Sequence, residues 1–209
     1  MIRVKICGIN DEPGLDAALD GGADWVGLVF FRRSPRFLEP ARAALLARRA
    51  AGRAAVVGLM VSPADQEIRD LVEACPLDAI QLYGRDDLPS GAIGEGRPVW
   101  HAVPVAAPED LPESTPADTL VVEPRPARTA TRPGGNGTPM DWSLLRHWKA
   151  PVPWLLAGGL TAENVAGAIR LSGATAVDVS SGVESAPGMK DPERIHAFIR
   201  AARAAVPGS

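Results

Sequence analysis

The amino-acid sequence predicts a single (β/α)8 barrel that spans residues 1–209. Apolar, β-rich runs alternate with helical patterns from one end of the chain to the other, which is typical of βα units. These runs are nearly continuous in apolar residues, as expected for parallel strands that are buried on both faces. The length suits one domain with a substantial core, and eight units in this length fit a compact barrel better than an open sheet.

The elements follow one another in strict alternation. The predicted strands are the apolar runs at residues 3–7, 25–30, 55–61, 78–82, 98–103, 119–123, 153–157 and 175–180. The predicted helices lie at residues 12–21, 40–51, 64–74, 86–94, 108–113, 142–148, 161–172 and 191–205. The segment 124–139 is rich in proline, arginine, threonine and glycine. It follows the sixth predicted strand, so we expect a long loop on the face of the barrel where the strands end.

Capping signals justify several of the helix boundaries. Ser62-Pro63 and Thr161 have the composition of an N-cap and a helix entry, and Asp191-Pro192 places proline at a first helical position. Gly52 and Gly173 lie just past predicted helix ends, where glycine adopts the backbone conformation that terminates a helix.

Composition excludes several classes of function. The formal net charge is −3, with lysine and arginine spread along the chain, which argues against a nucleic-acid-binding surface. No apolar run approaches the roughly 20 residues of a membrane span, and the N-terminal residues lack the zones of a signal peptide. Neither Cys7 nor Cys75 has metal-ligand spacing around it. We therefore expect a cytoplasmic protein with reduced thiols and without metal, membrane or nucleic acid.

Cys7 is a candidate catalytic residue because it ends the first predicted strand, where a barrel presents side chains to its active site. Lys5 lies two residues earlier, so both side chains are predicted to face the barrel interior. A thiolate at this position can act as a general base if Lys5 or a bound substrate lowers its pKa from about 8.5. The alternative is a small buried side chain with a packing role only. Cys75, before Pro76, fits such a structural role better.

Two glycine-containing loops are candidate phosphate ligands. Gly158-Gly159 and Ser180-Ser181-Gly182 end the seventh and eighth predicted strands, where barrels often bind phosphate. Glycines allow backbone N–H groups to approach phosphate oxygens without a Cβ in the way. Ordinary turns remain the alternative. A third cluster, Gly134-Gly135-Asn136-Gly137, fits a loop tip and a binding role equally well.

Three charged residues complete the candidate site. Arg36 lies between a proline and a phenylalanine and is predicted to pair bidentately with a carboxylate. Asp178 ends the eighth strand and is predicted to point into the site; satisfying loop amides is its alternative role. Glu123 ends the sixth strand beside apolar residues, so desolvation should raise its pKa and suit it to a general acid. Together these residues indicate an enzyme that acts on a sugar phosphate.

These motifs resemble those of the phosphoribosylanthranilate isomerase family, and the resemblance covers essentially the whole chain. The markers are Val4-Lys5-Ile6-Cys7-Gly8-Ile9, Gly27-Leu28-Val29-Phe30-Phe31 with Ser34-Pro35-Arg36, Ile80-Gln81-Leu82-Tyr83-Gly84, Gly134-Gly135-Asn136-Gly137 with Asp141-Trp142, Leu156-Ala157-Gly158-Gly159-Leu160, and Asp178-Val179-Ser180-Ser181-Gly182-Val183-Glu184 with Pro187-Gly188 and Lys190-Asp191. Each motif is weak alone; their order and spacing make the resemblance strong.

The resemblance implies a cofactor-free Amadori rearrangement of N-(5-phosphoribosyl)anthranilate to 1-(2-carboxyphenylamino)-1-deoxyribulose 5-phosphate, in tryptophan biosynthesis. Cys7 would be the general base at the sugar C2, and Glu123 would be the general acid at the ring oxygen. Arg36 would bind the anthranilate carboxylate, and the loops at Gly158-Gly159 and Ser180-Ser181-Gly182 would bind the phosphate. The implied partner is a small sugar phosphate. For the assembly we expect a monomer or a homodimer.

The chain departs from the family pattern at three positions that are expected to lie at the barrel mouth. Glu123 replaces the family's aspartate and is followed by Pro124 in place of a small residue. Tyr83 replaces a histidine, and His101 replaces a common lysine. Two alternatives therefore stay open: an isomerase for another aminosugar phosphate, and a ligand-binding relative without catalysis.

Overall fold

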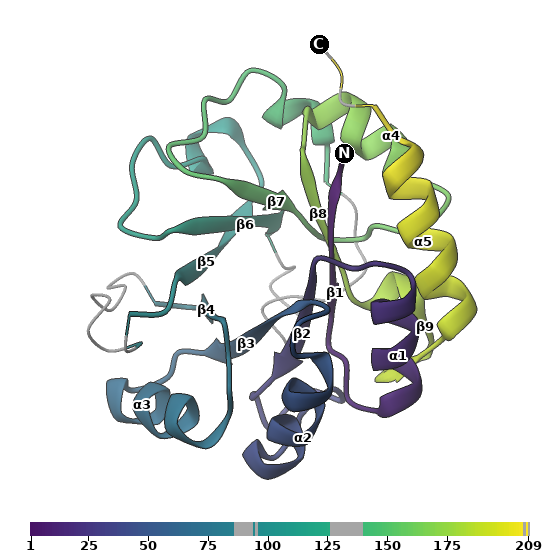
Figure 1. Cartoon of the computed structure of the whole chain (residues 1–209). Helices are drawn as coiled ribbons and strands as arrows, with labels where there is room; N and C mark the ends of the chain where they lie inside the picture. Colours follow the sequence, from purple (N-terminus) through teal and green to yellow (C-terminus); the bar gives the residue numbers. More distant parts are fainter. Residues whose placement is uncertain (86–93, 95, 126–139, 207, 209) are drawn as a thin grey trace.

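The computed structural model describes residues 1–85, 94, 96–125, 140–206 and 208. Eight strands close a parallel barrel in sequence order, with the last strand paired to the first (Figure 1). They are β1 (Arg3–Cys7), β2 (Trp25–Val29), β3 (Ala55–Val61), β4 (Ala79–Tyr83), β5 (Val99–Val105), β6 (Thr119–Pro124), β7 (Trp154–Leu156) and β8 (Ala176–Val179). The predicted (β/α)8 barrel is confirmed, and every predicted strand lies within two residues of an observed one.

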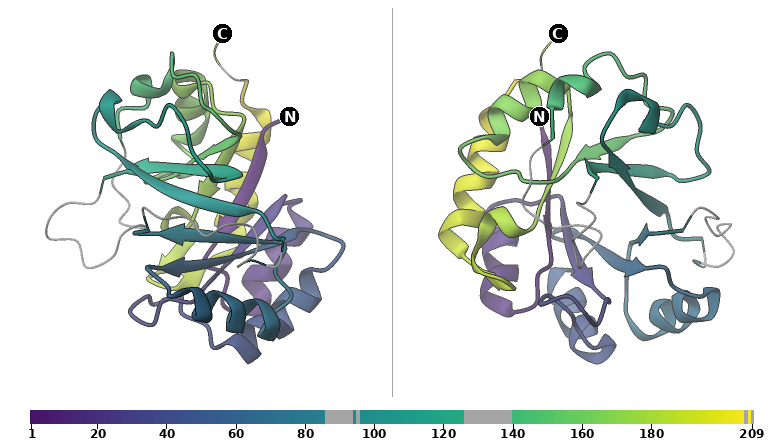
Figure 2. Two further views of the ribbon diagram at one scale, coloured as in Figure 1. Left: turned by 90° about the vertical axis from the view of Figure 1, so that its left-hand side faces the viewer. Right: turned by 180° about the vertical axis from the view of Figure 1, so that it is seen from behind.

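The described α-helices lie on the outside of the barrel and cover only part of its circumference (Figure 2). They are α1 (Glu12–Asp20), α2 (Pro40–Ala50), α3 (Asp65–Ala74), α4 (Val165–Ser172) and α5 (Pro192–Ala204), with 3-10 turns at η1 (Pro108–Asp110), η2 (Trp142–Leu145) and η3 (Ser181–Val183). The helices predicted at 108–113 and 142–148 are only 3-10 turns. After η1, Leu111 is extended because it precedes Pro112, and a residue before proline is disfavoured in the helical region. Of the predicted helix 86–94, only Gly94 is described.

The start of α5 at Pro192 is confirmed, and Asp191 caps the helix. Its side chain accepts hydrogen bonds from the backbone N–H groups of Glu193 and Arg194, at 3.0 and 3.2 Å, and Pro192 is the first helical residue. Gly173 follows α4 with a φ of 74°, in the left-handed conformation expected of a helix terminator.

The N-caps predicted at Ser62 and Thr161 are wrong. Ser62 has a φ of 44° and donates its hydroxyl to the Gly84 carbonyl at 3.0 Å, and α3 begins after Ala64. The Thr161 N–H donates to the Asn164 side chain at 2.8 Å, which closes a turn ahead of α4. The Ser62 hydroxyl is therefore used on the loop after β4, and the turn at Thr161 places the N-cap of α4 at Asn164, three residues later than predicted.

A short hairpin between β8 and α5 was not predicted. It consists of β9 (Glu184–Ala186) and β10 (Met189–Lys190), which pair antiparallel. Its turn contains Gly188 with a φ of 82°, and a Cβ there would lie 2.5 Å from the Pro35 carbonyl oxygen. The hairpin therefore packs closely against the loop that follows β2.

Side chains fill the barrel in layers because alternate residues of each strand face inward. One apolar layer consists of Val57, Ala79, Trp100, Val121, Leu155, Ala157 and Ala176. Nearer the carboxyl ends of the strands lies a second cluster, which consists of Cys7, Val29, Leu59, Tyr83 and Ala102. Within the described ranges, no helix has the length and apolar composition needed to cross a membrane.

Candidate active site

A pocket at the carboxyl ends of the strands contains the nine residues that the sequence predicted as catalytic or substrate-binding. Its lining includes Cys7, Arg36, Glu123, Gly158, Gly159, Asp178, Ser180, Ser181 and Gly182. Val29, Leu59 and Tyr83 contribute to its wall. Residues from seven different βα units therefore meet at one place, as the barrel topology requires of its strand ends.

Cys7 is buried at the end of β1, opposite Gly27 of β2. A Cβ at Gly27 would lie 2.8 Å from the Cys7 Sγ, so the glycine provides the space for the thiol. Burial raises the pKa of Cys7 above its ordinary value, although Lys5 and Lys190 act in the opposite direction. The pKa of Cys7 is therefore raised overall, and Lys5 acts in the lowering direction that we expected without outweighing burial.

Lys5 is fully buried beneath Cys7. Its Nζ donates to Gln81 Oε1 at 2.9 Å and to Asp178 Oδ1 at 3.1 Å. Burial lowers the pKa of Lys5, but the facing Asp178 and Cys7 outweigh this effect and leave the pKa above its usual value. Lys5 therefore stays cationic, and the ion pair fixes the Asp178 carboxylate at the pocket wall.

Glu123 is buried at the end of β6, with 4% of its surface exposed. Burial and the nearby Asp178 raise the pKa of Glu123 to about 8, as its apolar neighbours predicted. The Tyr83 hydroxyl donates to Glu123 Oε2 at 3.4 Å and accepts from Gln81 Nε2 at 3.3 Å. At neutral pH this carboxyl group is mainly protonated, the state that a general acid needs.

A polar chain therefore crosses the barrel from Asp178 through Lys5, Gln81 and Tyr83 to Glu123. Gln81 was not among the predicted site residues. The available signal was its position: it alternates with Ala79 and Tyr83 along β4, and an amide between Ile80 and Leu82 is unusual in a strand buried on both faces.

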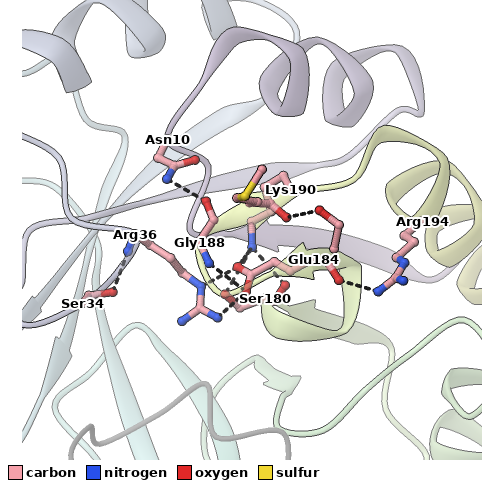
Figure 3. A network of polar contacts seen from close by, with 10 residues as sticks. Asn10, Ser34, Arg36, Ser180, Glu184, Gly188, Lys190 and Arg194 are labelled. Atoms are coloured by element: carbon pink, nitrogen blue, oxygen red, sulfur yellow. Dashed lines mark hydrogen bonds and ion pairs between the residues drawn. The ribbon is translucent and has the colours of Figure 1, made fainter.

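Arg36 is buried at the pocket edge and already has a carboxylate partner. Its Nε and Nη2 donate to Glu184 Oε1 and Oε2, at 2.6 and 2.7 Å (Figure 3). Lys190 Nζ donates to Glu184 Oε1 at 2.8 Å. Burial would raise the pKa of Glu184, but Arg36 and Lys190 hold it below its usual range. Arg36 is positioned as predicted, by a residue whose role the sequence did not reveal.

The glycine-containing loops after β7 and β8 contact each other. Gly158 has a φ of 86°, and a Cβ there would lie 1.9 Å from Pro124 Cδ. A Cβ at Gly182 would lie 1.9 Å from the Leu160 carbonyl oxygen. Real Cβ atoms do not approach so closely, so both positions require glycine. The third glycine cluster, residues 134–137, lies outside the described residues, as does most of the predicted loop 124–139.

The expectation that His101 contributes to the barrel mouth is wrong. Its neighbours Trp100 and Ala102 belong to the two inner clusters, so alternation along β5 turns His101 to the outer face. His101 is also absent from the described lining of the pocket. Parallel strands are apolar on both faces, so the sequence alone did not distinguish the inner from the outer face here.

Known proteins match this chain over nearly its whole length. Residues 4–201 match the family described as N-(5'-phosphoribosyl)anthranilate (PRA) isomerase. The N-(5'-phosphoribosyl)anthranilate isomerase of Cereibacter sphaeroides is 50% identical over 97% of this chain and 99% of its own length. That of Paramagnetospirillum magneticum is 47% identical over 99% of each chain.

Solved structures give the same result. A crystal structure of monomers of the dimeric phosphoribosylanthranilate isomerase from Thermotoga maritima has a TM-score of 0.82 and 32% identity, over 97% of this chain and 99% of that chain. A phosphoribosylanthranilate isomerase in complex with reduced 1-(o-carboxyphenylamino)-1-deoxyribulose 5-phosphate has a TM-score of 0.80 and 31% identity, with the same coverage.

Proposed function

Since the chain belongs to the N-(5'-phosphoribosyl)anthranilate isomerase family, we propose that its pocket isomerises N-(5-phosphoribosyl)anthranilate with Glu123 as the general acid and Cys7 as the general base. The reaction is the Amadori rearrangement of tryptophan biosynthesis. One observation carries the assignment of roles: a buried thiol, a carboxyl with a pKa of about 8, an arginine and two glycine-containing loops share one pocket. Residues 1–209 would act as one domain, in the cytoplasm, as a monomer or a homodimer.

Glu123 would act first. Its carboxyl group is mainly protonated at neutral pH because its pKa is about 8. It transfers this proton to the furanose ring oxygen as the bond from that oxygen to C1 breaks. The lone pair of the anthranilate nitrogen then forms a C=N bond to C1, which leaves a positive charge on nitrogen. A buried acid suits this step because it supplies a proton without admitting water.

Cys7 would act second, through its ionised form. The thiolate removes the proton from C2, the electrons of that C–H bond form a C1=C2 bond, and the C=N electrons return to nitrogen. The resulting enolamine becomes the ketone product by transfer of its hydroxyl proton to C1. Cys7 then releases a proton and Glu123 takes one up by exchange with solvent, which restores both groups for the next turnover. The charges of Lys5 and Lys190 favour the thiolate, and so does the cationic nitrogen formed in the first step.

The remaining residues would bind the substrate. Arg36 uses one edge of its guanidinium on Glu184, so the other edge, with Nη1, would bind the anthranilate carboxylate. Asp178 would accept hydrogen bonds from sugar hydroxyls. The loops at Gly158-Gly159 and Ser180-Ser181-Gly182 would hold the phosphate through backbone N–H groups.

A fluorescence time course with freshly generated phosphoribosylanthranilate tests these roles. We expect turnover by the wild type, and Cys7→Ser and Glu123→Gln should each lower kcat by about 10²-fold or more. Both variants should still bind the reduced product analogue, which separates lost chemistry from lost folding. Cys75→Ser is the matched control, because Cys75 is equally buried but does not line the described pocket. Unchanged turnover in both site variants would remove the proposed roles.

The departure at Glu123 is tested in the same assay with Glu123→Asp. If the longer side chain is the working acid, aspartate should lower kcat, because a displacement of about 1 Å can cost about 10²-fold. Weak wild-type activity that aspartate increases would instead indicate a displaced acid, and would favour another aminosugar phosphate or a binding role.

A further inference from the structure

The candidate carboxylate-binding residue belongs to a buried group of three charged side chains. The group joins Arg36, from the loop after β2, to Glu184 of β9 and Lys190 of β10 (Figure 3). All three residues are at most 6% exposed. The hairpin that carries two of them packs against the Arg36 loop through Gly188 and Pro35.

Glu184 is held rigidly enough to orient a partner. Its carboxylate accepts from Arg36 at two nitrogens, from Lys190 Nζ at 2.8 Å and from the Gly188 backbone N–H at 3.2 Å. Its carbonyl oxygen accepts from Arg194. Glu184 is therefore fixed from its backbone to both carboxylate oxygens.

The bidentate contact determines where the guanidinium plane lies. A free arginine side chain samples many rotamers, and ordering it for a ligand carries an entropic cost. Here Nε and Nη2 are bound on one edge, and the aliphatic stem packs over Gly8, where a Cβ would lie 2.3 Å from Arg36 Cδ. The opposite edge of the planar group is thereby preset, and Arg36 lines the pocket.

The charges of the group favour an anion on the pocket side. Two cationic side chains share one carboxylate, so the group carries a buried positive excess. Burying an uncompensated charge is costly, and a bound carboxylate offsets that cost.

Lys190 connects this group to the loop after β8. Its Nζ donates to the Ser180 carbonyl oxygen at 2.9 Å as well as to Glu184. Ser180 lines the pocket at the candidate phosphate loop. One ammonium group therefore ties the residue that orients Arg36 to the loop assigned to the phosphate, which fixes the spacing between the two anion sites.

We propose that Glu184 is a positioning residue that presets Arg36 for a substrate carboxylate, and that Lys190 keeps this pair in register with the Ser180 loop. Selection of a carboxylate-bearing aryl group thus depends on Glu184, which does not itself contact the substrate. The inference rests on the proposed function, in which Arg36 binds the anthranilate carboxylate.

The test compares two substrates, phosphoribosylanthranilate and N-(5-phosphoribosyl)aniline, which lacks only the carboxylate. The quantity measured is the ratio of their kcat/KM values, in the wild type, Glu184→Gln and Arg36→Met. We expect Glu184→Gln to lower this preference by 10-fold or more, mainly through KM for the anthranilate substrate. The double variant Arg36→Met/Glu184→Gln should show no less preference than Arg36→Met alone, because the two residues act as a unit. Glu39→Gln, at an exposed ion pair with Arg32, is the control.

The outcomes separate the inference from the proposed function. A general structural role for Glu184 would lower kcat/KM for both substrates equally and would overturn the inference. Loss of preference in Arg36→Met but not in Glu184→Gln would also overturn it, with the role of Arg36 intact. An unchanged preference in Arg36→Met would refute the proposed carboxylate site itself. If Glu184→Gln fails to fold because its two cations are left unpaired, Glu184→Met/Lys190→Met removes one charge of each sign and should show the same loss of preference.

Discussion

Gly27 lies opposite Cys7 in the register of β1 and β2, and the Cys7 thiol occupies the space that a side chain at Gly27 would fill. A Cβ at Gly27 would lie 2.8 Å from Sγ and 3.1 Å from the Cys7 Cα. The thiol and the backbone of β1 would both have to move to admit even a methyl group. The position of the proposed base is thus set by its neighbouring strand.

Gly27→Ala should therefore impair catalysis more than it impairs folding. Overpacking of this kind costs about 1–3 kcal/mol of stability, whereas displacement of the thiol should lower kcat by about 10-fold or more. Steady-state kinetics and urea unfolding measure the two effects. Gly167→Ala in α4 is the control, because the nearest atom to its added Cβ lies 4.0 Å away. A wild-type kcat in Gly27→Ala would show that this contact does not position the base.

The pH dependence of kcat/KM should have its maximum above pH 8. The proposed mechanism needs Glu123 protonated and Cys7 ionised. The pKa of Glu123 is about 8, and burial raises the pKa of Cys7 above its ordinary value. Only a minor fraction of the enzyme then has Glu123 protonated and Cys7 ionised at the same time. This fraction grows up to about pH 8 and declines above the pKa of the thiol. The rates should be measured between pH 7 and 10, because the substrate phosphate ionises near pH 6 and its charge is then constant over this range. A maximum at or below pH 7 would contradict this assignment.

Tyr83→Phe should shift the rising limb of that profile to higher pH. The Tyr83 hydroxyl donates to Glu123 at 3.4 Å and so favours the carboxylate. Without this donor the pKa of Glu123 rises further, by about half a unit to one unit for a hydrogen bond worth about 1 kcal/mol. The profile of kcat/KM for the two proteins measures the shift. Coincident limbs would mean that Tyr83 does not influence the acid.

Glu123 should also make the stability of the protein depend on pH. Its pKa is raised from 4.5 to about 8 in the folded state, so the folded protein retains a proton that the unfolded chain releases. The stabilisation is fully present below pH 4.5 and is lost as the pH rises through about 8, by roughly 5 kcal/mol in total. Urea unfolding at pH 5 and pH 8.5 should show a larger loss in the wild type than in Glu123→Gln. Equal losses would place the pKa of Glu123 near its ordinary value.

The fold was predictable because strands buried on both faces appear in the sequence as apolar runs. The site followed from the fold, since residues at strand ends such as Cys7, Glu123 and Asp178 must converge on one face. Neither the fold nor the convergence of the site residues required interatomic distances to be predicted. The family resemblance rested on the order and spacing of the same residues.

Three features were not predictable from the sequence, because they depend on very short strands, on strand register or on opposing effects on a pKa. The hairpin that carries Glu184 and Lys190 has strands of three and two residues, too short for a periodic signal. The inner or outer orientation of His101 required the register of β5. The pKa of Cys7 is the sum of burial and of nearby charges with opposite signs, and such a sum cannot be evaluated without the coordinates.

The pairing of β1 with β8 has a consequence for the chain while it is being made. Lys5 and Asp178 are 173 residues apart, so the ribosome completes almost the entire barrel before the first strand finds its last neighbour. Until then the nascent chain carries its thiol without the loops that we propose to bind the substrate phosphate. Catalytic competence should consequently appear in one late step of synthesis, when the eighth strand inserts beside the first.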